Sequence, residues 1–198
     1  CCASCSLVQL TGSVSPAVLF DTYQYFSSFS TTMLEAMGAL AGRMIDERRL
    51  GPDTLVVELA SNDGYLLTNY VERGVPVLGI DPAANVARVA VERGVPTLIA
   101  YFGEQVARDV VAERGRAAVV HANNVLAHVP DINDFVAGIA VLLAADGVAV
   151  IETPYLVRLI EHCEFDTIYH EHVFYYSLSA LRALFARHGL AEIGRAHV

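Results

Sequence analysis

The architecture of this chain is set by Leu55-Val56-Val57-Glu58-Leu59-Ala60-Ser61-Asn62-Asp63-Gly64. The run of apolar, β-branched residues at 55–59 predicts a buried strand, and the small and polar residues after it favour a turn. A helix is expected next, at 65–73. A strand, a tight turn and a helix form the first half of a βα unit, from which parallel sheets are built.

The same rhythm continues along the chain. The hexapeptide VERGVP occurs at 71–76 and again at 91–96, where Gly74 and Gly94 are suited to end a helix before the next strand. A helix is expected from Ser30 to the Gly51-Pro52 stop. Further strands are expected at 75–81, 95–102, 117–121 and 147–152, and helices at 84–93, 104–114, 132–144 and 178–188. This alternation predicts an α/β fold with a doubly wound parallel sheet.

The composition narrows the class of protein. The chain has 198 residues, 54% of them hydrophobic and 18% charged, with a formal net charge of −9. A negative chain without a basic block is a poor partner for nucleic acid or an anionic membrane surface. No apolar stretch approaches the length of a spanning helix, and no signal peptide opens the chain. We therefore expect a cytoplasmic monomer.

The first βα junction lacks the G-x-G-x-x-G fingerprint of dinucleotide-binding folds. Glu58 ends the strand, Ala60 allows a ligand to approach the backbone, and Asp81 ends the next strand, where an acid can bind ribose hydroxyls. A carboxylate at the turn disfavours a pyrophosphate but suits a cationic ligand, so an NAD-linked oxidoreductase is the least expected function. Each acid, taken singly, also fits a loop cap.

A second cluster, Tyr169-His170-Glu171-His172, follows the final strand of the expected sheet. Two imidazoles, a carboxylate and a phenol in four residues can divide acid and base roles. A single histidine is more often structural, but the whole run outside the carboxyl end of a strand favours function. A zinc-protease site is excluded because it needs two histidines four residues apart on a helix.

The motif E-x-[GA]-S-N-D-G, followed by G-I-D-P, resembles that of class I S-adenosylmethionine-dependent methyltransferases. More narrowly, the chain resembles sugar C-methyltransferases that act on nucleotide-linked keto-deoxysugars in antibiotic pathways. The segments that carry this resemblance are CASCSLVQL (2–10), YQYFSS (23–28), ELASNDGYLL (58–67), ANNVLAHVPD (122–131) and ETPY to YHEHVFYYS (152–177).

The resemblance implies a Rossmann-like methyltransferase domain at 30–190, preceded at 1–29 by the remnant of a zinc-binding module. Cys2 and Cys5 would supply two of four zinc ligands, with the other Cys-x-x-Cys pair and a C-terminal sugar-nucleotide domain lying outside this chain. The closing residues 193–198 resemble a translated sequencing adapter, so we expect a gene fragment with a non-biological tail.

The resemblance also implies roles for individual residues. His172 would be the general base, oriented or tuned by Glu171. Tyr169, His128 and Tyr23 (or Tyr25 in place of Tyr23) would line the sugar pocket. The residues expected to bind S-adenosylmethionine are Glu58, Ala60, Asn62, Asp81, Phe102 and Asn123, although core packing explains Phe102 nearly as well. Ala60 stands where the family usually has glycine, and its methyl group would crowd the cofactor slightly.

Two alternatives stay open. The chain could methylate oxygen or nitrogen on a small metabolite, with the histidines as base. It could instead bind the cofactor without turnover, as a fragment that lacks the domain presenting its substrate.

Overall fold

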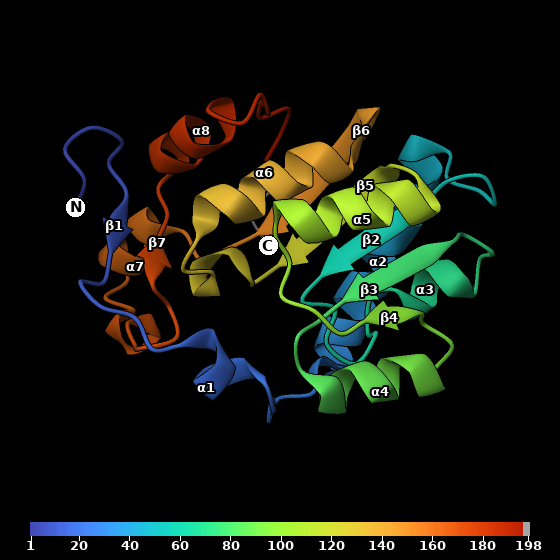
Figure 1. Ribbon diagram of the computed structural model, residues 1–198. Helices are drawn as coiled ribbons and strands as arrows, with labels where there is room; N and C mark the ends of the chain where they lie inside the picture. The colour runs from blue at the N-terminus through green and yellow to red at the C-terminus, as the bar shows by residue number, and fades with distance from the viewer. Residues whose placement is uncertain (196–198) are drawn as a thin grey trace.

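A five-stranded parallel sheet forms the centre of the molecule in the computed structural model, which describes residues 1–195 (Figure 1). The strand order is β4-β3-β2-β5-β6. The strands are β2 (Val56–Leu59), β3 (Val77–Ile80), β4 (Thr97–Leu98), β5 (Ala117–Asn123) and β6 (Leu143–Glu152). The order of connection reverses between β2 and β5. In open α/β sheets this switch point is where ligands bind, outside the carboxyl ends of the strands.

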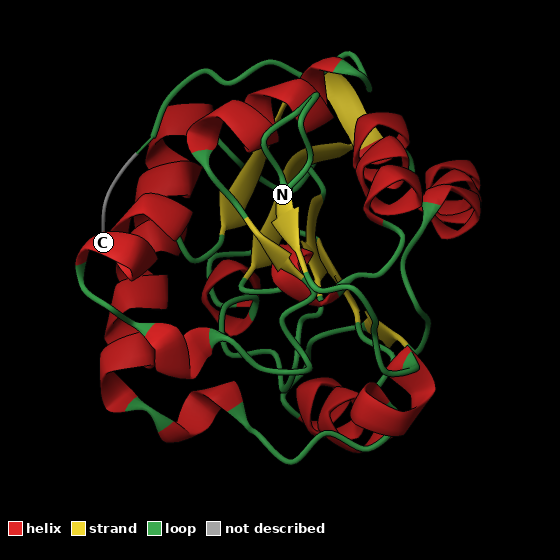
Figure 2. Cartoon of the chain, turned by 90° about the vertical axis from the view of Figure 1, so that its left-hand side faces the viewer, coloured by secondary structure: helices red, strands yellow, loops and turns green. Residues whose placement is uncertain are grey.

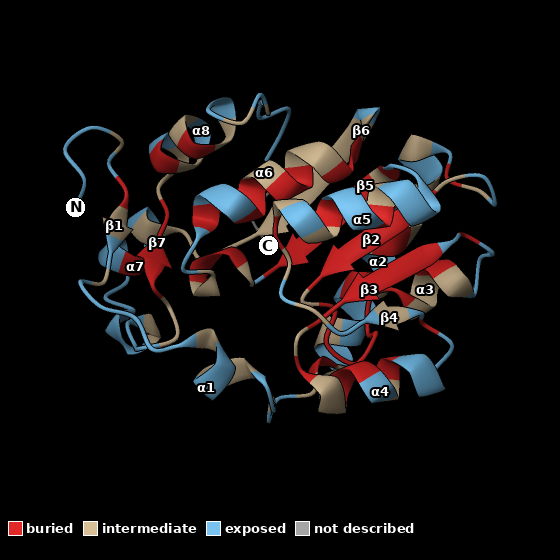
Figure 3. Cartoon of the chain, in the orientation of Figure 1, coloured by how far each residue is buried: buried red, intermediate tan, exposed pale blue. Residues whose placement is uncertain are grey.

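Helices cover both faces of the sheet, which confirms the doubly wound arrangement (Figure 2). Alternate residues of β2 point to opposite faces: Val57 and Leu59 join one apolar core, and Val56 joins the other. The first core contains α5 (Glu104–Arg114), α6 (Ile132–Leu142) and α8 (Leu178–Ala186), and the second contains α2 (Thr31–Arg48), α3 (Thr68–Val71) and α4 (Ala84–Glu92). The central strands are therefore buried on both sides (Figure 3).

Local chemistry explains where the helices begin and end. Ser30 caps α2, and its hydroxyl accepts a hydrogen bond from the Met33 amide at 3.2 Å. Asp131 caps α6 in the same way through the amide of Asp134. Gly74 and Gly94 follow their helices at φ of +73° and +83°, a conformation that glycine adopts without strain. Both glycines thus end a helix, as the repeated hexapeptide predicts.

The structure differs from the sequence prediction in the lengths of several elements. The third strand is only Thr97–Leu98 rather than 95–102, and the helix expected at 65–73 is reduced to α3, because residues 62–67 form turns first. β6 begins at Leu143, four residues before its expected start. The short helix α7 (Leu156–Glu161) lies in the stretch LVRLIEHCEF, whose sequence is helix-like. The short helix α1 (Pro16–Phe20) and the 3₁₀ turns Ser27–Phe29, Leu126–His128 and Phe165–Thr167 were not among the predicted elements.

The N-terminal segment packs on the same body as the sheet. Strand β1 (Val8–Gln9) pairs antiparallel with β7 (Phe174–Tyr175), a ribbon that the sequence patterns do not reveal. Leu7 belongs to the same apolar core as β2 and α6. In residues 1–195, no helix is both long and apolar enough to span a bilayer. Of the expected non-biological tail, residues 196–198 lie outside the described residues.

Candidate active site

Polar side chains gather where the central strands end. Glu58 lies in β2, Asp81 directly follows β3, Asn123 ends β5 and Glu152 ends β6. The register pairs Asn123 with Glu152, and β2 and β3 end together at Leu59 and Ile80. These side chains therefore share one edge of the sheet, next to the switch point.

Glu58 is the most unusual of these groups. Only 1% of the residue is exposed, and within residues 1–195 neither carboxylate oxygen forms a hydrogen bond of good geometry, although the Tyr65 hydroxyl lies beside the carboxylate. Burial raises the pKa of Glu58 well above its usual range; the Tyr65 hydroxyl opposes this rise, and the carboxylates of Asp81 and Asp63 add to it. A buried acid without a partner costs stability. A cation placed beside it would remove that cost.

The turn after β2 uses its own backbone donors. Ala60, Asn62 and Gly64 have φ values of +55°, +50° and +79°. The Ala60 amide donates to the Ile80 carbonyl at 2.8 Å, and the Asn62 amide donates to Asp81 Oδ2 at 2.9 Å. Since these amides are already bonded, the turn does not form the cradle of free N–H groups that a pyrophosphate needs.

Asp81 braces this turn. Its Oδ2 accepts the Asn62 amide, and its Oδ1 accepts the Ala83 amide at 2.8 Å. Burial raises the pKa of Asp81, while the two backbone bonds oppose the shift. An ionised carboxylate has about four lone-pair sites, so Asp81 keeps acceptor capacity for ligand hydroxyls.

The remaining expected cofactor residues have different surroundings. The side-chain amide of Asn62 bonds to the backbone at Tyr25 and Ser27. Asn123 is buried, and its Oδ1 has no partner within the described part of the chain. Phe102 packs edge-on against Phe135, with ring centroids 5.4 Å apart. This contact favours core packing as the role of Phe102.

The second cluster surrounds His172. A carbonyl can only accept, so the 2.8 Å contact between His172 Nδ1 and the Thr167 carbonyl oxygen places a proton on Nδ1. In the neutral ring Nε2 then carries the lone pair, and it lies 3.3 Å from the Tyr169 hydroxyl. His128 packs against His172, with ring centroids 4.7 Å apart. Burial lowers the pKa of His128 to about 4, and His172 adds to the shift.

Tyr23 connects this cluster to the sheet edge. Its ring contacts Phe20, which in turn packs edge-on against His128. The pKa of Tyr23 is raised to about 12, first by burial and then by the charges of Glu171, Tyr169 and Asp81. The ionisation of the Tyr23 phenol is therefore affected by charges in the His172 cluster and by Asp81. Tyr25, the alternative in the sequence, is 50% exposed.

Within residues 1–195 the carboxylate of Glu171 forms its ion-pair contact with the ring of His170 and none with that of His172. Its carboxylate lies 4.0 Å from His170 Nε2. The single proton on His172 Nδ1 is directed at the Thr167 carbonyl, so that backbone group is the partner that orients the ring. Sequence patterns do not identify Thr167, because its contribution comes from the backbone rather than from its side chain.

Cys2 and Cys5 lie in one tight turn. The Ser6 amide donates to the Cys2 carbonyl at 2.9 Å, and the backbone N–H groups of Cys5 and Ser4 lower the pKa of the Cys2 thiol. Such donors suit a metal-bound thiolate. Among residues 1–195, however, no group of three or more His, Cys, Asp and Glu side chains could hold a metal ion.

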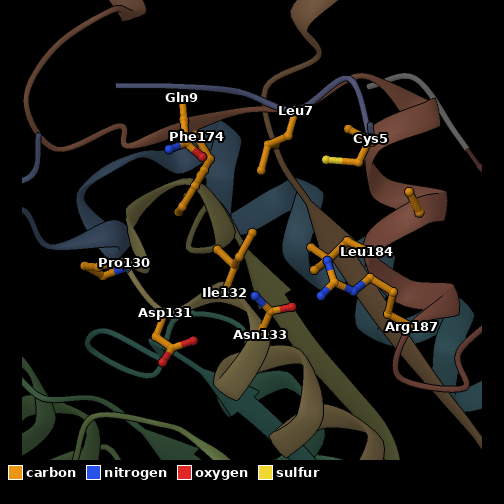
Figure 4. Close-up of a pocket in the computed structure, with 12 residues that line it drawn as sticks. Cys5, Leu7, Gln9, Pro130, Asp131, Ile132, Asn133, Phe174, Leu184 and Arg187 are labelled. Carbon is orange, nitrogen blue, oxygen red and sulfur yellow. The ribbon is translucent and has the colours of Figure 1, made fainter. Parts of the chain in front are cut away.

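A cavity of about 300 Å³ lies elsewhere, between the β1–β7 ribbon, the start of α6 and α8 (Figure 4). Leu7, Ile132 and Leu184 point into it, and Cys5 and Arg187 lie at its margin. None of the expected catalytic or cofactor-binding residues lines this cavity.

The sheet order, the switch point and the acids at its edge define a class I methyltransferase fold. A family model described as "Methyltransferase domain" matches residues 33–193, and the chain belongs to this family. The chain is 40% identical over 192 residues to the C-methyltransferase NovU of Streptomyces niveus. The match covers 97% of this chain and 46% of NovU, so the chain spans about half the length of this relative.

Solved structures share the fold at low identity. YcgJ of Bacillus subtilis has a TM-score of 0.59 at 18% identity, over 76% of this chain and 68% of that one. Magnesium protoporphyrin IX methyltransferase (ChlM) of Synechocystis PCC 6803, with bound SAM, has a TM-score of 0.57 at 13% identity, over 80% and 69% of the two chains. At these identities the likeness establishes the fold alone.

Proposed function

We propose that the protein transfers a methyl group from S-adenosylmethionine to a carbon next to the keto group of a nucleotide-linked deoxysugar. The observation that carries the proposal is the tautomer of His172, whose Nδ1–H is held by the Thr167 carbonyl so that Nε2 carries the lone pair that would take a proton. Similarity to NovU, named as a C-methyltransferase, supports methylation at carbon.

The sheet edge suits S-adenosylmethionine. Its sulfonium supplies an electrophilic methyl group, and its ammonium would give the buried carboxyl of Glu58 an opposite charge. The free acceptor sites of Asp81 would take the ribose hydroxyls. Ala60 leaves room for close approach to the turn, and Asn123 offers an unpaired buried oxygen. Phe102, packed on Phe135, would contribute at most its outer edge to the adenine.

The chemistry at carbon begins with a proton. His172 Nε2 takes the proton next to the keto group, the C–H electrons form a carbon–carbon double bond, and the keto oxygen becomes an enolate oxygen. Burial raises the pKa values of Tyr23 and Tyr169, so both phenols stay protonated and can donate to that oxygen. His128, with its pKa lowered to about 4, is neutral at pH 7 and adds no positive charge beside the base. The enolate carbon would then form a bond to the methyl group of S-adenosylmethionine as the methyl C–S bond breaks and its electron pair stays on sulfur. The carbonyl would reform, and S-adenosylhomocysteine would leave.

Proton exchange tests the carbon chemistry directly. The full-length gene product would be incubated in D₂O with S-adenosylhomocysteine and a nucleotide-linked keto-deoxysugar, and deuterium next to the keto group followed by NMR. We expect exchange in the wild type, a loss of about 10²-fold or more in His172→Gln, and little change in the matched control His170→Gln. Methyl transfer to an oxygen or nitrogen of the substrate without exchange would refute the proposal.

The N-terminal turn supports a smaller proposal, that Cys2 and Cys5 supply half of a structural zinc site. Zinc in such sites is held by four ligands, so two further ligands would have to come from other parts of the full-length protein. We expect the full-length product to contain one zinc ion per chain by elemental analysis and to lose it in Cys2→Ser. Full zinc content in that variant would contradict the assignment, with Cys163→Ser as the control.

A further inference from the structure

Residues 21–28, here called the strap, run past the start of α4 (Figure 1). Asn85, in the first turn of α4, holds one residue of the strap by two hydrogen bonds. The Tyr23 amide donates to Asn85 Oδ1 at 3.1 Å, and Asn85 Nδ2 donates to the Tyr23 carbonyl at 2.7 Å. A side-chain amide carries one acceptor and one donor group in a plane, so it can bind both backbone groups of a residue as a neighbouring strand would.

Asn62 repeats this arrangement two residues further along. Its Oδ1 accepts the Ser27 amide at 3.0 Å, and its Nδ2 donates to the Tyr25 carbonyl at 3.0 Å. Tyr23, which faces the His172 cluster, therefore belongs to a segment fixed by two asparagine side chains, one from the turn after β2 and one from the first turn of α4.

Both ends of the strap are tied down as well. The Tyr101 hydroxyl donates to Asp21 Oδ1 at 2.7 Å. At the other end Arg93 donates to the Ser28 hydroxyl at 3.0 Å and forms an ion pair at 3.1 Å with the buried carboxylate of Asp63. The middle of the strap thus depends on the two asparagines.

The same network reaches the expected ribose site. Asp81 holds the backbone of Asn62 with one carboxylate oxygen and the backbone of Ala83 with the other. Ala83 lies two residues before Asn85. A ligand that fixes Asp81 would therefore also stiffen the positions from which both asparagines reach the strap.

We propose that Asn85 is a positioning residue: it fixes the backbone of Tyr23 so that the phenol faces the His172 cluster, and with Asn62 it couples this placement to the occupancy of Asp81. The second half of this inference rests on the proposed cofactor. The first half concerns the chain alone and can be tested without any ligand.

The placement of Tyr23 can be read from its ionisation. With tyrosine labelled by ¹³C at the ζ carbon, the Tyr23 signal would be assigned by Tyr23→Phe and recorded at pH 10.5. A phenol with a pKa of about 12 is almost wholly protonated there, whereas one near the ordinary value of 10 is mostly ionised. We expect mostly protonated Tyr23 in the wild type and mostly ionised Tyr23 in Asn85→Ala.

The matched control is Asn133→Ala, an exposed asparagine in α6 that contacts His188. It should leave the Tyr23 signal unchanged. A signal in Asn85→Ala equal to that of the wild type would overturn the positioning role. If Asn85→Ala does not fold, the same measurement is made on Asn85→Ser. Serine is common at the start of a helix, but its side chain is too short to bind both the amide and the carbonyl of Tyr23.

Hydrogen exchange tests the coupling. S-adenosylhomocysteine should slow exchange of the Ser27 amide about tenfold in the wild type, and this protection should be lost in Asn85→Ala while the ligand's Kd changes less than threefold. Unchanged Ser27 exchange with bound ligand would overturn the coupling. A wild type that binds no S-adenosylhomocysteine would instead refute the proposed cofactor and with it the coupling, and would leave the ionisation test of Asn85 standing.

Discussion

The carboxyl end of the sheet around Glu58 and Asp81, here called the cofactor edge, and the cluster around His172 are built in different ways. At the cofactor edge, Glu58 and Asp81 lie at the ends of adjacent buried strands, and the intervening turn is held by backbone hydrogen bonds. The His172 cluster is assembled from three separate segments, around residues 20–23, 126–128 and 167–172, and most of its contacts are between rings. The cofactor edge is thus formed by the sheet itself, whereas the cluster depends on loops meeting across it.

The largest effect should come from the cofactor edge alone. Glu58→Gln removes the charge that would bind the cofactor's ammonium, and we expect S-adenosylhomocysteine affinity to fall about 100-fold by calorimetry, since hydrogen bonds to charged groups contribute about 1.5–3 kcal/mol. Retained affinity would show that Glu58 does not contact the ligand.

The same variant should be more stable than the wild type at neutral pH. The pKa of Glu58 is raised above the ordinary 4.5 in the folded chain, so the unfolded chain ionises more readily and stability falls as pH rises above 4.5. Glutamine does not ionise, so this loss of stability is absent from the variant. We expect the melting temperature to rise by several °C at pH 7 and the gain to vanish near pH 4.5.

The next effect should be confined to the cluster. Tyr169→Phe removes the hydroxyl that lies 3.3 Å from His172 Nε2. We expect kcat for deuterium exchange to fall about tenfold, in the range of one lost hydrogen bond, while S-adenosylhomocysteine affinity stays within twofold. An equal loss of ligand affinity would mean that the two regions are one site with shared contacts. The control is Asn133→Ala, an exposed asparagine of α6 that lies outside the cluster.

A separate effect, on stability rather than on catalysis, concerns a buried histidine of β5. His121 pairs with the Tyr70 hydroxyl at 2.8 Å, and burial lowers its pKa to about 4. Between pH 6.5 and 4 the unfolded chain binds a proton that the folded chain does not, so stability falls as pH falls through this window. We expect His121→Asn to flatten this fall by about 2 kcal/mol between pH 7.5 and 5 in urea titrations. If the free energy of unfolding fell equally with pH in the wild type and in His121→Asn, His121 would not be a neutral histidine buried in the folded chain.

The smallest effect is expected at Ala60. Its φ of +55° is unfavourable for a residue with a Cβ but not for glycine. Ala60→Gly relieves that strain and increases the entropy of the unfolded chain, so we expect a net gain of about 0.5 kcal/mol in the free energy of unfolding. Ala112→Gly in the helical interior of α5 should instead lose about 1 kcal/mol. A loss at Ala60 of the same size would show that the turn is not strained.

Sequence patterns predict the two regions unequally. The parallel sheet follows from strand and helix periodicity, and Glu58 and Asp81 follow from their places at strand ends. The patterns do not show how Tyr23 reaches the cluster, because that depends on Asn85 binding a backbone 62 residues away. They also miss the Thr167 carbonyl and the β1–β7 pairing, since neither leaves a signal in residue type. Whether the residues named for catalysis, cofactor binding and zinc have those roles stays a prediction.

The strand order also has a consequence for synthesis of the chain. β2 ends at Leu59, yet one of its two neighbours, β5, begins only at Ala117. As the chain leaves the ribosome, β2, β3 and β4 can pair in turn, but the β5 side of β2 stays open until the later segment emerges. Parallel pairings over such separations form slowly, since the loop between them must be closed first. The β5 side of β2, including the backbone at Glu58 that pairs with His121, therefore stays unpaired until the segment Ala117–Asn123 has been made.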